Sequence, residues 1–210
     1  MGKDYVSDVV IHRLPRYYRY LEELMDEGVI LITSADLSER MNVTSSQIRQ
    51  DLNHFSGYGQ QGIGYNVAYL HDEIGKLLGV DKLNHMIIIG ANLFSRALLV
   101  FNDWSDNYVI DAVFDSTPEQ AKKEFADHEI LDLSLLENYI KDHPVDIAVI
   151  VTPKTESQEI ADRLVESGVK AIWNFSHRDL NVPDDVSVED IRLVESLESL
   201  SCRANVYAQG

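Results

Sequence analysis

The chain has 210 residues and 45% of them are hydrophobic, so it can bury one medium core or two small ones, while a single cysteine, Cys202, excludes an internal disulfide. A formal net charge of −17 argues against broad binding of nucleic acid, so any DNA contact must come from a local patch. No apolar run reaches the roughly 18 residues of a membrane span, and the N-terminus has no basic-then-apolar signal pattern, so we expect a cytoplasmic protein without a membrane partner.

The first predicted element is an amphipathic helix over residues 9–25. Apolar and aromatic residues recur there at intervals of three and four, namely Val10, Leu14, Tyr17, Tyr18, Leu21 and Leu24. Arg13, Arg16 and Arg19 stand three apart, so they form a neighbouring stripe on the same helix. The stripe is either a solvated face or a DNA-facing patch.

Residues 33–55 predict two short helices with a tight joint. Thr33 or Ser34 can cap the first helix, and Thr44–Gln47 match a capping box in which the Thr hydroxyl accepts the Gln N–H while the Gln side chain reaches back. This layout is typical of a helix-turn-helix, whose second helix presents polar side chains to the major groove. The predicted DNA-facing residues of that helix are Ser45, Ser46, Gln47, Arg49, Gln50 and Asn53. A helical packing module with no nucleic-acid role is the alternative.

A glycine-dense loop at residues 57–64 follows the two helices, as expected of a β-hairpin wing that approaches a groove closely. A further helix begins at Asn66 and ends at Gly79. Its predicted inner face comprises Val67, Leu70, Ile74, Leu77 and Leu78. The first domain is therefore expected to span residues 1–80 and to bind DNA.

Apolar runs alternate with helical patterns in the rest of the chain. The predicted strands are residues 86–89, 109–114, 147–151 and 169–173, and the predicted helices are residues 96–101, 118–125, 133–141 and 157–166. This alternation predicts a Rossmann-like, doubly wound parallel sheet over residues 81–190. The expected fold class is therefore α/β, with a winged helix-turn-helix in front of the sheet and a helix after it. Ligands of such sheets bind at the carboxyl ends of the strands.

The turn after the first of these strands is similar to the G-x-G-x-x-G motif of dinucleotide-binding domains. Its six positions are Gly90, Ala91, Asn92, Leu93, Phe94 and Ser95, so two of the three glycines are replaced. Each replacement adds a Cβ atom where the backbone must approach a pyrophosphate or a neighbouring element. We therefore expect the turn to be a site for NAD(H) with weakened affinity.

Other candidate cofactor contacts follow the remaining strands. Asp115 lies 25 residues after Gly90, close to the spacing of the acidic residue that binds the ribose, although Asp is also a common turn former. Thr152 and Pro153 follow one strand, and Asn174 follows another. Catalytic machinery is hard to find. The seven histidines include no i, i+4 pair, and His177 at this edge has no orienting partner in sequence, so we expect neither a metal site nor an enzyme.

The final segment, residues 191–210, predicts a helix with one apolar face. Leu193, Val194, Leu197 and Leu200 share that face. Either a second subunit or the chain's own surface must cover it.

The order of winged helix, dinucleotide fold and final helix resembles the Rex family of redox-sensing transcriptional repressors over essentially the whole chain. The resemblance rests on five pieces: residues 13–21, residues 47–52, residues 62–67, residues 161–165 and residues 174–183. It implies a homodimer whose C-terminal helix is swapped into the partner and whose two winged helices bind a palindromic operator. It also implies that NADH binds between the subunits, closes the dimer and releases DNA.

The chain departs from the family pattern on the DNA side. Gln50 stands where the recognition helix of the family has a basic residue, and Gln61, before Gly62, stands where the wing has one. Each change removes a positive charge aimed at DNA, so operator contact is expected to be weaker or to differ in sequence.

The family's switch resembles a network of an arginine, a tyrosine and an aspartate. Arg19 matches the arginine, whereas Phe101 and Arg192 stand at the other two positions. Three functions therefore remain open: a repressor modulated by NADH and NAD+, a related regulator that has lost NAD(H) sensing, and an NAD-dependent oxidoreductase. The oxidoreductase explains only the α/β half of the chain.

Overall fold

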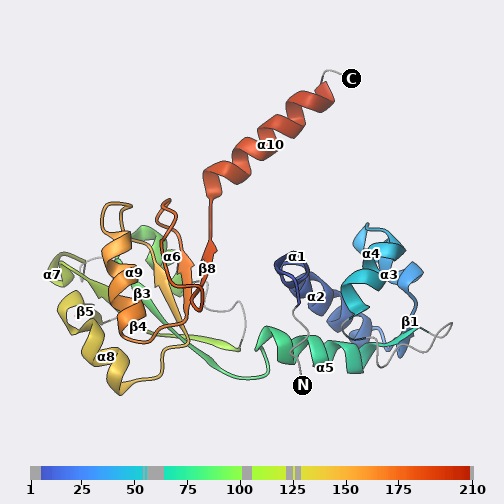
Figure 1. Ribbon diagram of the computed structural model, residues 1–210, viewed down its shortest axis with the longest axis horizontal. Coiled ribbons are helices and arrows are strands. Elements are labelled where there is room, and N and C mark those ends of the chain that lie inside the picture. Colours follow the sequence, from blue (N-terminus) through green and yellow to red (C-terminus); the bar gives the residue numbers. More distant parts are fainter. Residues whose placement is uncertain are drawn as a thin grey trace. The chain divides into compact units, whose positions relative to one another are not determined.

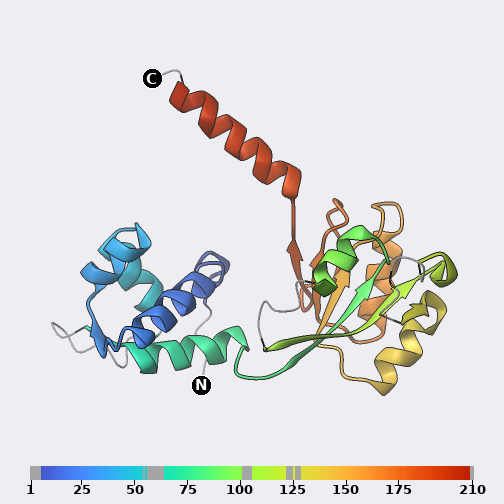
Figure 2. The same ribbon diagram turned by 180° about the vertical axis from the view of Figure 1, so that it is seen from behind.

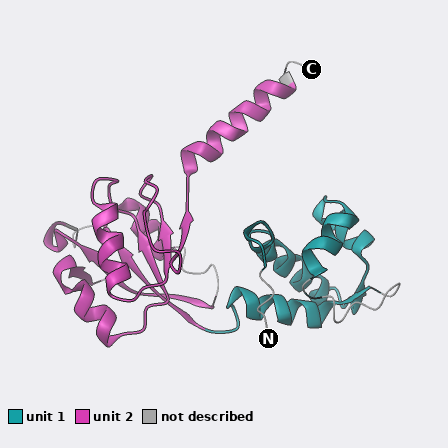
Figure 3. Cartoon of the chain, in the orientation of Figure 1, with its two compact units in different colours: residues 1–82 teal, residues 83–210 magenta. Residues whose placement is uncertain are grey.

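The computed structural model describes residues 6–53, 55, 64–100, 106–121, 125 and 129–208. Two compact units divide the chain, Met1–Lys82 and Leu83–Gly210 (Figure 3). Helices make up most of the first unit and an α/β sheet makes up the second (Figure 1), which confirms the predicted order of a DNA-binding type of fold followed by a dinucleotide type of fold. Within the described residues, no helix is long and apolar enough to span a membrane.

Helices surround a single core in the first unit. Its elements are α1 (Asp8–Ile11), α2 (Leu14–Asp26), β1 (Leu31–Ile32), α3 (Ser34–Met41), α4 (Ser45–Asp51), β2 (Tyr65–Asn66) and α5 (Val67–Leu78). The prediction of one continuous helix over residues 9–25 is wrong, because the helix is interrupted between Ile11, the last residue of α1, and Leu14, the first residue of α2. Pro15 lies in the first turn of α2, and within a continuous helix its ring would clash with the carbonyl of Ile11, the last residue of α1.

Side-chain caps fix both helices of the helix-turn-helix. Thr33 caps α3 in a reciprocal capping box with Asp36, and the Thr44 hydroxyl accepts the N–H of Gln47 at 3.1 Å. Asn42, in the left-handed region with φ 51°, makes the joint between them. The second half of the predicted Thr44 box is wrong, because the Gln47 amide donates to Asp51 Oδ1 at 2.7 Å instead. A buried carboxylate one turn away is the stronger partner for that amide.

The predicted apolar faces form the core of the first unit. Its fully buried side chains include Leu14, Tyr17, Leu21, Leu24, Leu37, Met41, Ile48, Leu52, Val67 and Ile74. Leu77 is an exception, since it is 50% exposed although the helical pattern placed it inside.

A two-stranded ribbon, β1 against β2, forms the base of the predicted wing. Gly64 enters it with φ 102°, and a Cβ atom there would lie 2.5 Å from the carbonyl oxygen of Ile32, so only glycine fits. Most of the predicted wing, including Gln61 and Gly62, lies outside the described residues.

The six strands described in the second unit form one parallel sheet, in the order β5-β4-β3-β6-β7-β8. The strands are β3 (Asn84–Ile89), β4 (Tyr108–Asp115), β5 (Ile130–Asp132), β6 (Ile147–Ile150), β7 (Ala171–Asn174) and β8 (Ser187–Asp190). The first strand, β3, lies in the middle of the sheet. The next two strands, β4 and β5, are added on one side of it, and β6, β7 and β8 are added on the other, as in dinucleotide-binding sheets. The sequence pattern missed β5 and β8, which are three- and four-residue edge strands.

Helices cover the two faces of the sheet. They are α6 (Leu93–Val100), α7 (Pro118–Ala121), η3 (Leu133–Leu135), α8 (Leu136–Asp142) and α9 (Ser157–Glu166). Helices α8 and α9 pack against Ile87 and Ile89 on the face seen in Figure 1, whereas α6 packs against Ile88 on the opposite face, seen in Figure 2. The sheet is therefore doubly wound, as predicted.

The last helix, α10 (Leu193–Ala208), follows β8. Every residue of it whose burial is described, 193–207, is exposed. The predicted apolar face, with Leu193, Leu197 and Leu200 each more than half exposed, has no cover within the described part of its own unit.

Candidate DNA-binding and nucleotide-binding sites

The predicted recognition helix α4 presents four polar side chains to solvent. Ser46, Arg49, Gln50 and Asn53, the last just beyond the helix, are exposed. The Arg49 guanidinium donates to the Ser34 hydroxyl at 3.1 Å, which leaves most of its donors available.

The other two predicted DNA-facing residues of α4 are half-buried. The hydroxyl of Ser45 lies 3.0 Å from that of Ser38, so this contact joins α4 to α3. Gln47 bonds to Asp51 through its side-chain amide. Both side chains therefore support the geometry of the helix-turn-helix, and their contact with DNA stays a prediction.

A buried carboxylate, Asp51, joins α4 to α2. Arg13 binds it with two hydrogen bonds of 2.8 and 2.6 Å, and the Tyr17 hydroxyl donates to it at 2.9 Å. The Asp51 side chain is fully buried, and Arg13 is the cation that compensates its charge. Burial, together with the bond to Asp51, raises the pKa of the Tyr17 hydroxyl.

Arg13 thus has a structural partner that its spacing in sequence did not indicate. Its contact with DNA stays a prediction, and the guanidinium would have to make that contact while it binds Asp51. The sequence does contain a signal for Asp51. It lies on the inner face of α4 between Ile48 and Leu52, where an apolar residue is expected.

The other two arginines of the stripe are exposed. Arg16 donates to the carbonyl of Met41, the last residue of α3. Its guanidinium and that of Arg19 lie 5.7 and 5.0 Å from the ring centroid of Tyr20. Arg13, just before α2, therefore binds α4, Arg16 on α2 binds the end of α3, and Arg16 and Arg19 keep positive charge at the surface.

The second candidate site lies at the carboxyl ends of β3 and β6, where the order in which strands are added to the sheet changes side. Gly90 ends β3 with φ 106°, and a Cβ atom there would lie 3.1 Å from Thr152 Cγ2 and 3.2 Å from Thr152 N. The first position of the motif therefore requires glycine, because the segment after β6 passes close by. Thr152 is 9% exposed and its Oγ1 is buried without a hydrogen-bond partner among the described residues, whereas Pro153 is exposed.

The two residues that replace glycines bond to the turn itself. The Asn92 Oδ1 atom accepts the N–H groups of Phe94 at 2.9 Å and Ser95 at 3.2 Å, and its Nδ2 donates to the Val151 carbonyl at 2.8 Å. The Ser95 hydroxyl accepts the Asn92 N–H at 2.7 Å and donates to the Asn92 carbonyl at 2.8 Å. The side chain of Leu93, between them, is exposed.

Asp115 ends β4 beside this turn, as the spacing predicted. Its Oδ2 accepts the N–H of Ala91 at 2.8 Å, and its Oδ1 accepts the N–H and the hydroxyl of Thr117 at 2.7 and 3.0 Å. The carboxylate is therefore held at the edge of the turn, with acceptor capacity left on Oδ2.

An apolar cavity of about 190 Å³ opens at the same edge of the sheet. Its lining includes Phe94, Val151, Phe175, His177 and Leu193. The Phe94 and Phe175 rings lie 4.7 Å apart, a contact that the sequence pattern did not indicate. His177 is exposed and has φ 56°.

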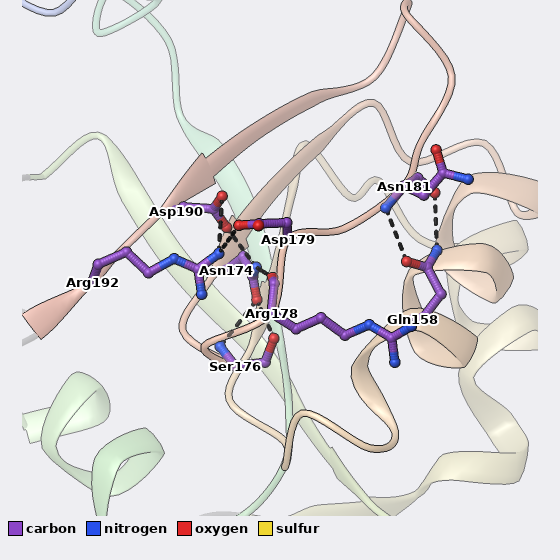
Figure 4. Close-up of polar contacts among 8 residues, drawn as sticks. All are labelled: Gln158, Asn174, Ser176, Arg178, Asp179, Asn181, Asp190 and Arg192. Atoms are coloured by element: carbon purple, nitrogen blue, oxygen red, sulfur yellow. Dashed lines mark hydrogen bonds and ion pairs between the residues drawn. The ribbon is translucent and has the colours of Figure 1, made fainter. Parts of the chain in front are cut away.

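Asn174, predicted to contact a cofactor, is fully buried. Figure 4 shows its amide donating to the Arg178 carbonyl and to Asp190, at 2.7 and 2.6 Å, while its oxygen accepts two bonds from Ser176. These bonds use both donors and both acceptor sites of the side chain. The side chain therefore organises the loop after β7, and its predicted contact with a cofactor stays a prediction.

Arg192, which stands where the family pattern has the switch aspartate, belongs to the same network. Its guanidinium lies 2.7 Å from Asp179 and 3.2 Å from Asp190 (Figure 4). Its charge is therefore compensated within its own unit. Phe101, the second predicted switch residue, lies outside the described residues.

Comparison with known proteins places both units of the chain in one family. Residues 5–53 match the family described as "Putative DNA-binding protein N-terminus", and residues 81–178 match the one described as "CoA binding domain". The redox-sensing transcriptional repressor Rex of Thermoanaerobacter sp. (strain X514) is 47% identical over 204 residues, 97% of this chain and 91% of that protein. The chain belongs to the Rex family.

Solved structures agree with this assignment. The crystal structure of the Rex-family repressor RSP in complex with beta-NAD+ and operator DNA is 45% identical, with a TM-score of 0.87, and the match covers 99% of this chain and 96% of RSP. RSP in complex with beta-NADH is 43% identical, with a TM-score of 0.83, over 99% of this chain and 98% of RSP.

As a Rex protein the chain is a transcriptional repressor and not an enzyme, which confirms that prediction. Groups of His, Cys, Asp or Glu that could hold a metal ion do not occur among the residues that the structure describes.

Proposed function

We propose that this Rex protein is a dimeric repressor that binds a palindromic operator and whose affinity for DNA depends on NADH and NAD+. The observation that carries the proposal is the likeness of both units to RSP, which was solved with beta-NAD+ and operator DNA. In this proposal residues 1–80 bind DNA, residues 81–190 bind the nucleotide and dimerise, and residues 191–210 form the dimer helix.

On the DNA side, α4 is the recognition helix. Arg49, Gln50, Ser46 and Asn53 supply the exposed donors and acceptors, and Asp51 fixes the helix on α2 from behind. Because the chain is acidic overall, phosphate contacts must come from a few exposed cations of this unit, among them Arg16, Arg19 and Arg49, and affinity should fall as salt is raised.

On the nucleotide side, the residues fit a dinucleotide at two points. Gly90 lets β3 and β6 approach, and the Asp115 carboxylate lies beside the turn where it would hold the ribose hydroxyls. Between them, the turn itself fits poorly, because its N–H groups are bonded to Asn92 and Ser95. The bound nucleotide would supply the redox state that the repressor senses.

The exposed apolar face of α10 supports the dimer. A helix with Leu193, Leu197 and Leu200 all exposed must bury that face to be stable in water. The swapped arrangement that the family implies would cover it with a second copy of the chain.

A matched pair of variants tests the DNA half of the proposal. Arg49→Gln removes an exposed cation of α4, whereas Arg40→Gln removes one of α3 that is paired with Glu27 at 2.8 and 2.5 Å. In anisotropy titrations with the RSP operator at low salt, Arg49→Gln should weaken binding about tenfold and Arg40→Gln by less than about twofold. Equal affinities for wild type and Arg49→Gln, or no shift at all, would contradict the proposal.

A second candidate function is a Rex-type regulator that no longer senses NAD(H). Phe101 and Arg192 at the switch positions favour it, since Arg192 already has Asp179 and Asp190 as partners. Such a protein would bind its operator with the same affinity whether or not a nucleotide is present.

A further inference from the structure

Side chains of the turn between β3 and α6, together with Asp115, accept the backbone N–H groups of Ala91, Asn92, Phe94 and Ser95. In a helix the first N–H groups have no partner within the helix, and in dinucleotide-binding domains the pyrophosphate takes that place. Here the N–H groups of Phe94 and Ser95 donate to the Asn92 carboxamide, and that of Asn92 donates to the Ser95 hydroxyl. The N–H of Ala91 donates to Asp115.

These bonds are tied into the sheet. The Asn92 amide also donates to the carbonyl of Val151 at the end of β6, across the point where the strand order reverses. Ser95 is fully buried and its hydroxyl donates back to Asn92. The two side chains that replace glycines therefore interlock and hold each other in the place where an anion would otherwise accept the same N–H groups.

We propose that Asn92 and Ser95 form an internal competitor of the dinucleotide pyrophosphate, which raises the nucleotide concentration that this repressor needs for its response. The inference rests on the proposed function. To bind, the pyrophosphate must displace the Asn92 carboxamide from two N–H groups and the Ser95 hydroxyl from a third. The obstacle is thus a set of existing hydrogen bonds as well as the added Cβ atoms.

The competitor acts on a part that NADH and NAD+ share. Their pyrophosphates are identical, and the redox difference lies in the nicotinamide ring. Both affinities are therefore lowered by the same factor, while the ratio between them is unchanged. The concentration of total nucleotide at which the repressor responds moves upward, and its discrimination between the two redox forms does not move.

Calorimetric titration of the full chain with NADH and with NAD+ tests the inference. The double variant Asn92→Gly with Ser95→Gly should bind both nucleotides at least tenfold more tightly than wild type, with the ratio of the two dissociation constants unchanged within about twofold. Asn138→Ala, an exposed amide on α8, is the matched control and should bind as wild type does. Unchanged or weaker binding by the folded double variant would overturn the inference, as would an absence of binding by both proteins.

A second variant guards against loss of the fold. Asn92→Asp keeps an acceptor for the N–H groups of Phe94 and Ser95, loses the bond from Nδ2 to the Val151 carbonyl and faces the pyrophosphate with a negative charge. It should still unfold in one cooperative transition, at a lower melting temperature than wild type, and bind both nucleotides at least fivefold more weakly. Binding equal to that of wild type would show that the pyrophosphate does not occupy this turn.

The outcome can be separated from that of the proposed function. If the operator affinity of wild type responds to NADH while the double variant binds nucleotide no better, only the internal competitor is refuted. If the operator affinity of wild type and of the double variant is indifferent to NADH at saturation, the redox response itself is refuted.

Discussion

At the scale of single residues, Asp51 has the most demanding position in the first unit. It is a fully buried carboxylate that accepts hydrogen bonds from Arg13, Tyr17 and Gln47. A buried charge without its partners would cost free energy of folding, so the three donors and the Asp51 carboxylate depend on one another. The recognition helix is therefore positioned from its inner side.

We predict that Asp51→Asn lowers the free energy of unfolding of the first unit by about 2 kcal/mol, because the ion pair with Arg13 is lost and one acceptor oxygen becomes an NH2 donor among the three donors. Urea denaturation followed by circular dichroism measures this change. Asp36→Asn, which alters an exposed cap, is the matched control and should cost less than about 1 kcal/mol. A loss below about 0.5 kcal/mol for Asp51→Asn would contradict the account.

Sequence reasoning at this scale identified residues better than it identified their partners. Spacing alone placed Arg13, Arg16 and Arg19 on one stripe, but the partner of Arg13 is 38 residues away in sequence. Asn92 and Ser95 were recognised as replaced glycines with extra Cβ atoms. Their hydrogen bonds depend on backbone geometry that the sequence pattern does not contain.

At the scale of elements, periodicity predicted the helices of the core and the central strands. It failed where a local rule overrides it. Pro15 breaks the first helix, and the edge strands β5 and β8, with at most one buried residue each, lack the buried apolar run that marks β6 and β7. Helix α10 (Leu193–Ala208) is the opposite case, since its apolar face was predicted and is exposed, without cover among the described residues of its own unit.

We predict that Leu197→Glu prevents dimerisation, because it places a charge in the centre of the apolar face of α10, where a partner would bury it. Size-exclusion chromatography with light scattering at micromolar concentration should give the mass of a dimer for wild type and of a monomer for the variant. Ser199→Glu adds the same charge on the opposite face and should remain dimeric. A dimeric Leu197→Glu would mean that α10 is not the dimer helix.

At the scale of the whole molecule, the resemblance over both units identified the family, which no single motif could do. The glycine motif alone would have suggested a poor dehydrogenase, and the helix-turn-helix alone would have left a packing module open. Together with the order β5-β4-β3-β6-β7-β8 of the sheet, they indicate a DNA-binding type of fold joined to a dinucleotide type of fold. Membership of the Rex family accounts for both parts, while the residues at the turn and at the switch positions differ from its pattern.

The proposed function requires that one chain couples nucleotide binding to DNA binding. The most direct measurement is the affinity of the wild-type protein for the RSP operator duplex, by fluorescence anisotropy, with NADH or NAD+ raised to saturation as confirmed calorimetrically on the same sample. The account predicts that NADH weakens operator binding at least fivefold more than NAD+ does. Identical operator affinity with NADH, with NAD+ and with no nucleotide would contradict it.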